Sequence, residues 1–245
     1  MDTPSLGTRL LAEILGTFLF FFLGFSGIAT AAKFGVDAIS ALGVAAGFGF
    51  GLSLAITAFG QISGGHFNPA VTAGLAAARK MSPREVIPYW VAQLIGGFGA
   101  VLVMAVVFGA TVTDVLETSP GSGVDDWGAL VLEIIATALF VMVILTVATD
   151  VSAPWQGVMA PWLIGLFIFT AATVVGPASG GSFNPARSLD PVIYNGDFGD
   201  VWIYIIGPLA GGILGGAVWA AFTDQVDRTR RMPPRSQPGE RRSAS

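Results

Sequence analysis

The sequence predicts an all-α membrane protein: six transmembrane helices and two re-entrant half-helices, arranged as an inverted repeat of three spans. Of its 245 residues, 53% are hydrophobic and only 11% carry a charge, whereas a soluble domain carries about 25% charged residues. Several long segments are apolar enough to cross a bilayer. An eight-residue motif also occurs twice, 116 residues apart.

The apolar segments give the number of spans, because a transmembrane helix needs about 20 apolar residues. Two charge-free runs are too long for one span: 41 residues separate Asp37 from Arg79, and 36 separate Asp150 from Arg187. Each run is predicted to hold one full span and one half-length segment. The other four spans are expected at about 9–32, 86–110, 127–149 and 201–223.

The first apolar segment could also imitate a signal peptide. Residues 29–31 (Ala-Thr-Ala) resemble a small-residue cleavage site. A matching segment occurs later in the chain, where it cannot be a signal, so a span is favoured.

The repeated motif divides the chain into two homologous halves. Residues 63–70 (SGGHFNPA) recur as residues 179–186 (SGGSFNPA), with seven of eight positions identical. We therefore expect a single transmembrane domain over residues 1–223, with halves at about 9–110 and 127–223. Further matches flank the motif: EILGT at 13–17 with EIIAT at 133–137, and Tyr89, Gly96 and Gly97 with Tyr204, Gly211 and Gly212.

Three spans per half is an odd number, so the second half must enter the membrane inverted. The excess of Lys and Arg on cytoplasmic segments then sets the orientation. With both termini in the cytoplasm, acidic residues of 114–126 and 190–200 lie outside. Ten of the twelve positive charges fall inside: Arg9, Arg79, Lys80, Arg84, Arg228, Arg230, Arg231, Arg235, Arg241 and Arg242.

Each copy of the motif is predicted to start a short helix, although an ordinary surface loop is the alternative. Asn is a good N-cap and Pro is favoured at the first helical position. Helices are expected from Asn68-Pro69 to about Arg79 and from Asn184-Pro185 to about Tyr194, with their N-termini meeting near the midplane. If each Asn oxygen caps its helix, the amide NH₂ is free to bind the oxygen of a neutral solute. The positive helix ends oppose cations and a proton chain.

The two Asn-Pro-Ala boxes, residues 68–70 (Asn68, Pro69, Ala70) and 184–186 (Asn184, Pro185, Ala186), carry a specific resemblance. Together with the inverted repeat and the Glu-x-x-x-Thr pair, they resemble the aquaporin (major intrinsic protein) family over residues 9–223. The resemblance implies a passive channel for water that excludes protons and ions. It also implies a homotetramer with one pore per subunit, in the plasma membrane. Permeation by glycerol or other small neutral solutes stays open, as does a role mainly as a glycerol facilitator.

The same resemblance implies an outer selectivity constriction formed by Phe48, Ala172, Gly181 and Arg187, with Phe50 as the alternative to Phe48. Arg187 would donate to permeant oxygens and repel cations; the alternative is a loop arginine at the interface. Water-selective members typically have a histidine at the second position, where this chain has Ala172. Glycerol-conducting members usually have an aspartate after the arginine, where this chain has a serine. The sequence thus matches neither the water-selective nor the glycerol-conducting members fully. Its features favour a water channel with some leak of small solutes.

Three further residues are expected to support the loops. By family resemblance, His66 packs behind the first loop with a ring nitrogen bonded to backbone, although a proton relay is the alternative. Glu13 and Glu133 are expected to accept hydrogen bonds from the backbone of the re-entrant loops. If they instead coupled protons to transport, the protein would be a secondary transporter.

Other functional classes find little support. The chain has no cysteine and one histidine, which excludes disulfides and leaves little for a metal site. We expect no enzymatic activity, no cofactor and no nucleic-acid partner, and contacts with membrane lipids. A structural junction protein would carry the same boxes without permeability. Residues 224–245 are predicted to form a disordered cytoplasmic tail that contacts anionic lipid.

Overall fold

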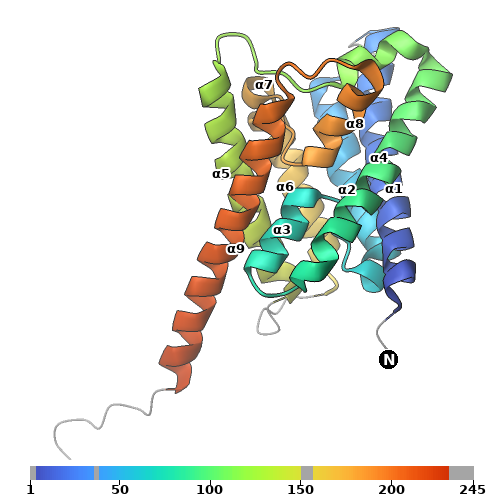
Figure 1. The fold of residues 1–245 in the computed structure, drawn as a ribbon. Helices are drawn as coiled ribbons and strands as arrows, with labels where there is room; N and C mark the ends of the chain where they lie inside the picture. Colours follow the sequence, from blue (N-terminus) through green and yellow to red (C-terminus); the bar gives the residue numbers. More distant parts are fainter. Residues whose placement is uncertain (1–3, 36–38, 150–156, 232–245) are drawn as a thin grey trace, which may run out of the picture.

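The computed structural model describes residues 4–35, 39–149 and 157–231, and within these ranges all regular structure is helical. Five helices are long and apolar enough to cross a membrane; α6 is a sixth, shorter apolar helix of 15 residues. The predicted fold class is confirmed. In chain order the main elements are α1 (Leu6–Phe34), α2 (Ala41–Ser63), α3 (Pro69–Ala77), α4 (Val86–Phe108), the 3₁₀ segment η2 (Ala110–Leu116), α5 (Asp126–Ile144), α6 (Ala160–Val174), α7 (Gly176–Ser179), α8 (Pro185–Asn195) and α9 (Val201–Arg231) (Figure 1).

The helix ends follow local chemistry. Ser5 and Ser40 cap α1 and α2 by accepting bonds from the backbone three residues later, at 3.2 and 3.3 Å. Gly64 ends α2 in the left-handed conformation, with φ 98°, where glycine avoids the steric cost of a Cβ. These caps satisfy backbone groups that would otherwise be unpaired at the helix ends.

The last helix extends beyond the predicted end at residue 223. α9 continues to Arg231, because no glycine or proline interrupts the chain between Gly216 and Pro233. Residues 224–231, predicted to belong to the disordered tail, are therefore helical. The rest of the predicted tail, 232–245, lies outside the described residues.

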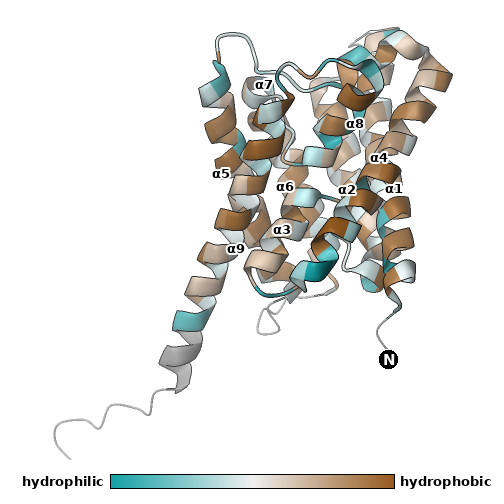
Figure 2. Ribbon diagram, viewed as in Figure 1, coloured by the Kyte–Doolittle hydropathy of each residue, from teal (hydrophilic) through white to brown (hydrophobic). Residues whose placement is uncertain are grey.

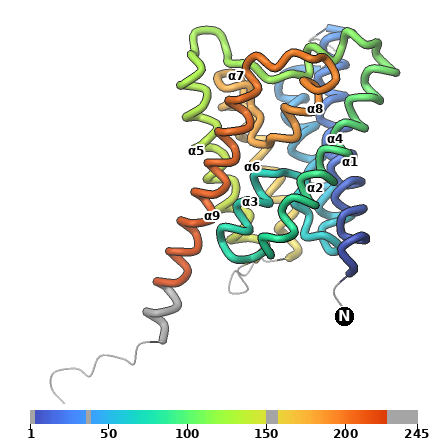
Figure 3. Tube along the Cα trace, viewed as in Figure 1, coloured from blue at the N-terminus to red at the C-terminus, as the bar shows by residue number. Residues whose placement is uncertain are grey.

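The two half-helices enter from opposite ends of the bundle and point their N-termini at each other (Figure 3). Each packs on the last long helix of the other half, α3 on α9 and α8 on α4. Glycines at matching positions of the two halves permit close helix crossings. A Cβ on Gly96 would lie 2.2 Å from the Ile14 carbonyl oxygen, and one on Gly211 would lie 2.3 Å from that of Ile134. The same close packing therefore joins α1 to α4 and α5 to α9.

The two ends of the bundle differ in the sign of their charge, and hydrophobic residues predominate along the long helices between them (Figure 2). We call the end with exposed Arg79, Lys80 and Arg84 the basic end; α1 begins there and α9 ends there (Figure 1). Asp190, expected in an acidic outer segment, is instead fully buried within α8. The opposite, acidic end carries Asp114, Glu117, Asp125, Asp126, Asp197 and Asp200.

Candidate functional site

The two Asn-Pro-Ala boxes meet at the centre of the bundle. The Asn68 carboxamide oxygen accepts from the Ala70 backbone N–H at 2.8 Å, and Asn184 caps α8 in the same way at 3.1 Å. The amide NH₂ groups are not wholly free, which corrects the expectation. Asn68 Nδ2 donates across to the Phe183 carbonyl at 2.8 Å, and Asn184 Nδ2 to the Phe67 carbonyl at 3.0 Å. The second N–H of each amide takes no part in these bonds.

The cross-loop bonds depend on an uncommon backbone conformation. Phe67 and Phe183 have φ values of 48° and 53°, a region that non-glycine residues rarely occupy. This conformation presents each phenylalanine carbonyl to the asparagine of the other half. Strain of this kind persists where the surrounding structure determines it, often at a functional site.

A buried carboxylate organises each re-entrant loop. Glu133 accepts from the Ser182 and Phe183 backbone N–H groups at 3.0 and 2.7 Å, and from the Ser179 hydroxyl. Glu13 accepts the equivalent bonds from His66, Phe67 and Ser63 in the first half. Both carboxylates are fully buried, so these donors satisfy acceptors that water cannot reach.

The first loop has an additional support that the sequence did not reveal. Gln93 donates to Glu13 Oε2 at 2.8 Å and to the Thr72 hydroxyl at 3.0 Å. A His66 ring nitrogen, Nδ1, lies 3.1 Å from the same hydroxyl. The expected partner was the backbone, whereas the structure has a side chain as the partner. The repeat gives no signal for Gln93. At the spacing that relates Tyr89 to Tyr204, its counterpart in the second half is Pro208.

A small cavity lies between the two asparagines and the side chains of Phe48 and Ala172. Its volume is about 20 Å³, and one buried water needs about 10–15 Å³. Three of the predicted constriction residues, Phe48, Ala172 and Gly181, line it together with Asn68 and Asn184. Four further wall residues are apolar and were not predicted, although they match at the spacings of the repeat: Phe20 with Phe140, and Leu52 with Ile168. His66, Ser182 and Phe183 complete the wall.

Arg187 lies beside this cavity, near the start of α8. Its Nη1 donates to the Leu116 carbonyl at 2.6 Å, and its Cζ lies 5.3 Å from the Phe48 ring centroid. The residue is 5% exposed, and its Nε has no partner among the described residues. Phe50, the alternative to Phe48, is 46% exposed and stacks on Phe169 at the outer surface. Phe48, not Phe50, therefore lies next to the arginine.

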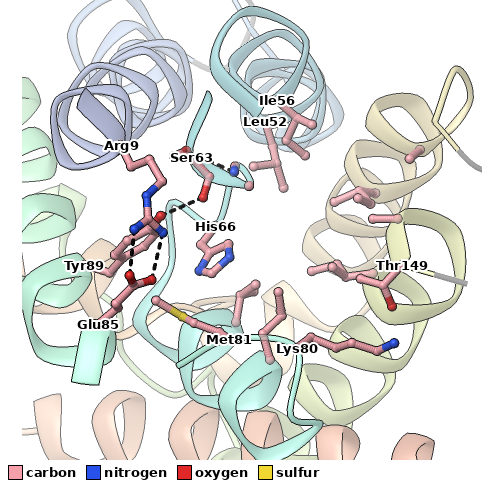
Figure 4. A pocket seen from close by; sticks show the side chains of 18 of the residues that line it. Arg9, Leu52, Ile56, Ser63, His66, Lys80, Met81, Glu85, Tyr89 and Thr149 are labelled. Carbon is pink, nitrogen blue, oxygen red and sulfur yellow. Dashed lines mark hydrogen bonds and ion pairs between the residues drawn. The ribbon is translucent and has the colours of Figure 1, made fainter. Parts of the chain in front are cut away.

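A wide vestibule opens at the basic end (Figure 4), with a volume of about 370 Å³. Arg9 and Glu85 face each other there through two hydrogen bonds of 2.8 and 2.6 Å. Lys80 and the ring of His66 also line the space. A polar vestibule thus leads to a one-water cavity in the middle of an apolar bundle.

Two half-helices that meet at the centre of a bundle of apolar, membrane-length helices, beside a small cavity and a vestibule, are the architecture of a transmembrane channel. The comparisons give the family. The model for the major intrinsic proteins matches residues 1–219, so the chain belongs to the major intrinsic protein (aquaporin) family. It is a multi-pass membrane protein and a passive channel for water and small solutes, and the channels of this family are transporters without enzymatic activity.

Relatives support this assignment over most of the chain. A probable aquaporin TIP2-2 from Oryza sativa subsp. japonica is 41% identical over 213 residues, covering 85% of this chain and 84% of the relative. Aquaporin Z from Photorhabdus laumondii is 40% identical over 224 residues, covering 86% and 95%. The X-ray structure of the aquaglyceroporin from Plasmodium falciparum superposes with a TM-score of 0.79 at 24% identity, covering 92% and 98%. At that identity, the structural match shows the fold.

Proposed function

We propose that water is the main permeant and that glycerol and other small neutral solutes pass more slowly. The observation that carries this proposal is the cavity of about 20 Å³ between Phe48 and the two asparagines. A space of that size holds about one water. Ala172 and Gly181 have small side chains, so their side of the cavity leaves room for a slightly larger solute. The asparagine N–H groups and Arg187 bind the oxygen of the passing molecule.

The same residues exclude protons and ions. The N-termini of α3 and α8 both face the centre, and each carries about half a positive charge. Arg187 adds a full positive charge next to the cavity. A cation would have to give up its water shell against this field, and a solute oxygen turned toward donors on both sides cannot continue a proton chain.

Two alternative functions predict different transport. A glycerol facilitator would conduct glycerol as its main substrate; the small side chains at positions 172 and 181 favour that reading, and the one-water cavity opposes it. A secondary transporter would need a carboxylate free to exchange protons. Both Glu13 and Glu133 are occupied by loop donors, which favours a channel. The proposed role is transport, without enzymatic catalysis.

The cellular arrangement belongs to the same proposal. The protein lies in the plasma membrane with both termini in the cytoplasm, as the positive charges at the basic end favour. Residues 1–223 act as a single channel domain. Four copies associate as a homotetramer with a pore in each subunit, in contact with membrane lipids.

Stopped-flow light scattering on proteoliposomes tests the main proposal. Vesicles with the protein should shrink much faster than empty ones after an osmotic step, and should take up glycerol and urea more slowly than they lose water. Vesicles no faster than empty ones would refute the channel. Glycerol permeability equal to that of water would favour the facilitator, and dependence on a proton gradient would favour the transporter.

A further inference from the structure

The position of Arg187 is set by a loop outside the repeat. Its guanidinium donates to the Leu116 carbonyl at 2.6 Å, and Leu116 is the last residue of η2. This segment connects the two halves and has no counterpart within either of them. A carbonyl in such a connection stays in place only if other contacts hold the segment.

Side chains of α8 supply those contacts on both sides of Leu116. Asn195 uses both ends of its amide: its oxygen accepts from the Thr113 hydroxyl at 2.5 Å, and its NH₂ donates to Glu117 at 2.6 Å. The Thr118 hydroxyl donates to Ser188 at 2.7 Å. α8 therefore carries Arg187 and also the residues that hold its acceptor.

The Thr118 contact also reaches the lining of the cavity. The Ser188 hydroxyl donates to Ser182 Oγ at 2.7 Å, and the Ser182 hydroxyl donates to the Asn184 carbonyl at 2.9 Å. Thr118, Ser182 and Ser188 are all buried, so water does not substitute for these bonds. Because Ser182 and Asn184 line the cavity, one chain of hydroxyls connects the loop to two residues of the cavity wall.

We propose that Asn195 and Thr118 are specificity-determining positioning residues, an inference that rests on the proposed function. They fix the Leu116 carbonyl, which fixes the Arg187 guanidinium and so limits the width available to solutes larger than water. Neither residue contacts the permeant. Losing either one allows the guanidinium to move away from the pore axis, which relaxes selection against glycerol without closing the path for water.

The test compares glycerol and water permeability in proteoliposomes for Thr118→Val and Asn195→Leu. Each variant should raise the glycerol-to-water permeability ratio by about two- to tenfold, because the net free energy of one hydrogen bond corresponds to a factor of that size. Thr118→Ser keeps the hydroxyl and should match the wild type. Thr223→Val is the matched control, because its hydroxyl bonds only the Trp219 carbonyl of its own helix. If Asn195→Leu does not fold, the isosteric Thr118→Val variant carries the test.

A double variant separates positioning from general loosening. In the Arg187→Val background, Thr118→Val should give no further increase, because the group that it positions is absent. An equal increase in both backgrounds would overturn the inference, as would folded single variants with the wild-type ratio. Wild-type vesicles that conduct no water would overturn the proposed function and this inference with it. Conducting wild type with unchanged variants would overturn only the inference.

Discussion

Four positions near the acidic end each have an equivalent near the basic end. Each position and its equivalent belong to different halves of the chain and lie 116 residues apart. The cavity that three of the first four positions line measures about 20 Å³, and the vestibule at the basic end measures about 370 Å³. The four basic-end counterparts all line the vestibule. The pairs are Phe48 with Ile164, Ala172 with Ile56, Gly181 with Gly65, and Arg187 with Val71.

The backbone does not account for this difference. Gly65 and Gly181 have φ values of 67° and 65°, and the two phenylalanines before the asparagines have nearly the same conformation. The two ends differ in their side chains, among them Arg187 in place of Val71, and in the connecting loop that supplies the Leu116 carbonyl. A symmetric scaffold therefore places the helix ends, and the proposed selectivity rests on residues of one half and of the connecting loop.

The largest expected effect concerns the two buried carboxylates. Glu133→Gln should lower the free energy of unfolding by about 3 kcal/mol, because an amide NH₂ then faces the loop N–H groups. Glu13→Gln should cost less, about 1–2 kcal/mol. Next to Glu13, the Gln93 amide can turn over. Its Oε1, which has no partner among the described residues, then accepts a hydrogen bond from the new amide. Thermal unfolding in detergent measures both, and an equal or reversed order would contradict the asymmetry.

An intermediate effect is expected from filling the narrow cavity. Ala172→Leu should lower glycerol permeability about tenfold and water permeability less, because added methylenes overfill a tight space. Ile56→Phe enlarges the equivalent side chain in the wide vestibule and should leave both permeabilities nearly unchanged. Stopped-flow measurements on the two variants decide the point. Similar losses in both would show that the narrow cavity does not limit solutes.

The smallest effect is expected at the rim of the vestibule. Arg9 and Glu85 are 19% and 25% exposed in their side chains, and ion pairs accessible to solvent contribute less than about 1 kcal/mol. Arg9→Ala should therefore lower stability only slightly and leave water permeability at the wild-type value. A large loss of water permeability would mean that the basic end also limits flux.

Much of this arrangement could be predicted from the repeat. The Asn-Pro pairs specify helix starts by local chemistry, and the structure has α3 and α8 beginning at Pro69 and Pro185. The odd number of spans in each half predicted that the half-helices enter from opposite ends. The cavity walls Phe20 and Phe140 could also have been found by extending the spacing of Glu13 and Glu133.

The contacts that break the symmetry could not be predicted. Gln93 reaches Glu13 across 80 residues, and Arg187 reaches Leu116 across 71. Neither pair has a counterpart in the other half, and each depends on how separate helices pack. The cross-loop bonds of the asparagines likewise depend on the φ values of Phe67 and Phe183, which no residue pattern specifies.

The glycerol-to-water permeability ratio of Arg187→Val tests the central claim most directly. This variant gives the acidic end the residue of its counterpart, Val71. The ratio should rise about tenfold, as expected for losing a charge-assisted donor, while water permeability stays near the wild-type value. The control Val71→Ala, in the vestibule, should leave the ratio unchanged. An unchanged ratio in Arg187→Val, or an equal rise in Val71→Ala, would contradict selectivity built in one half.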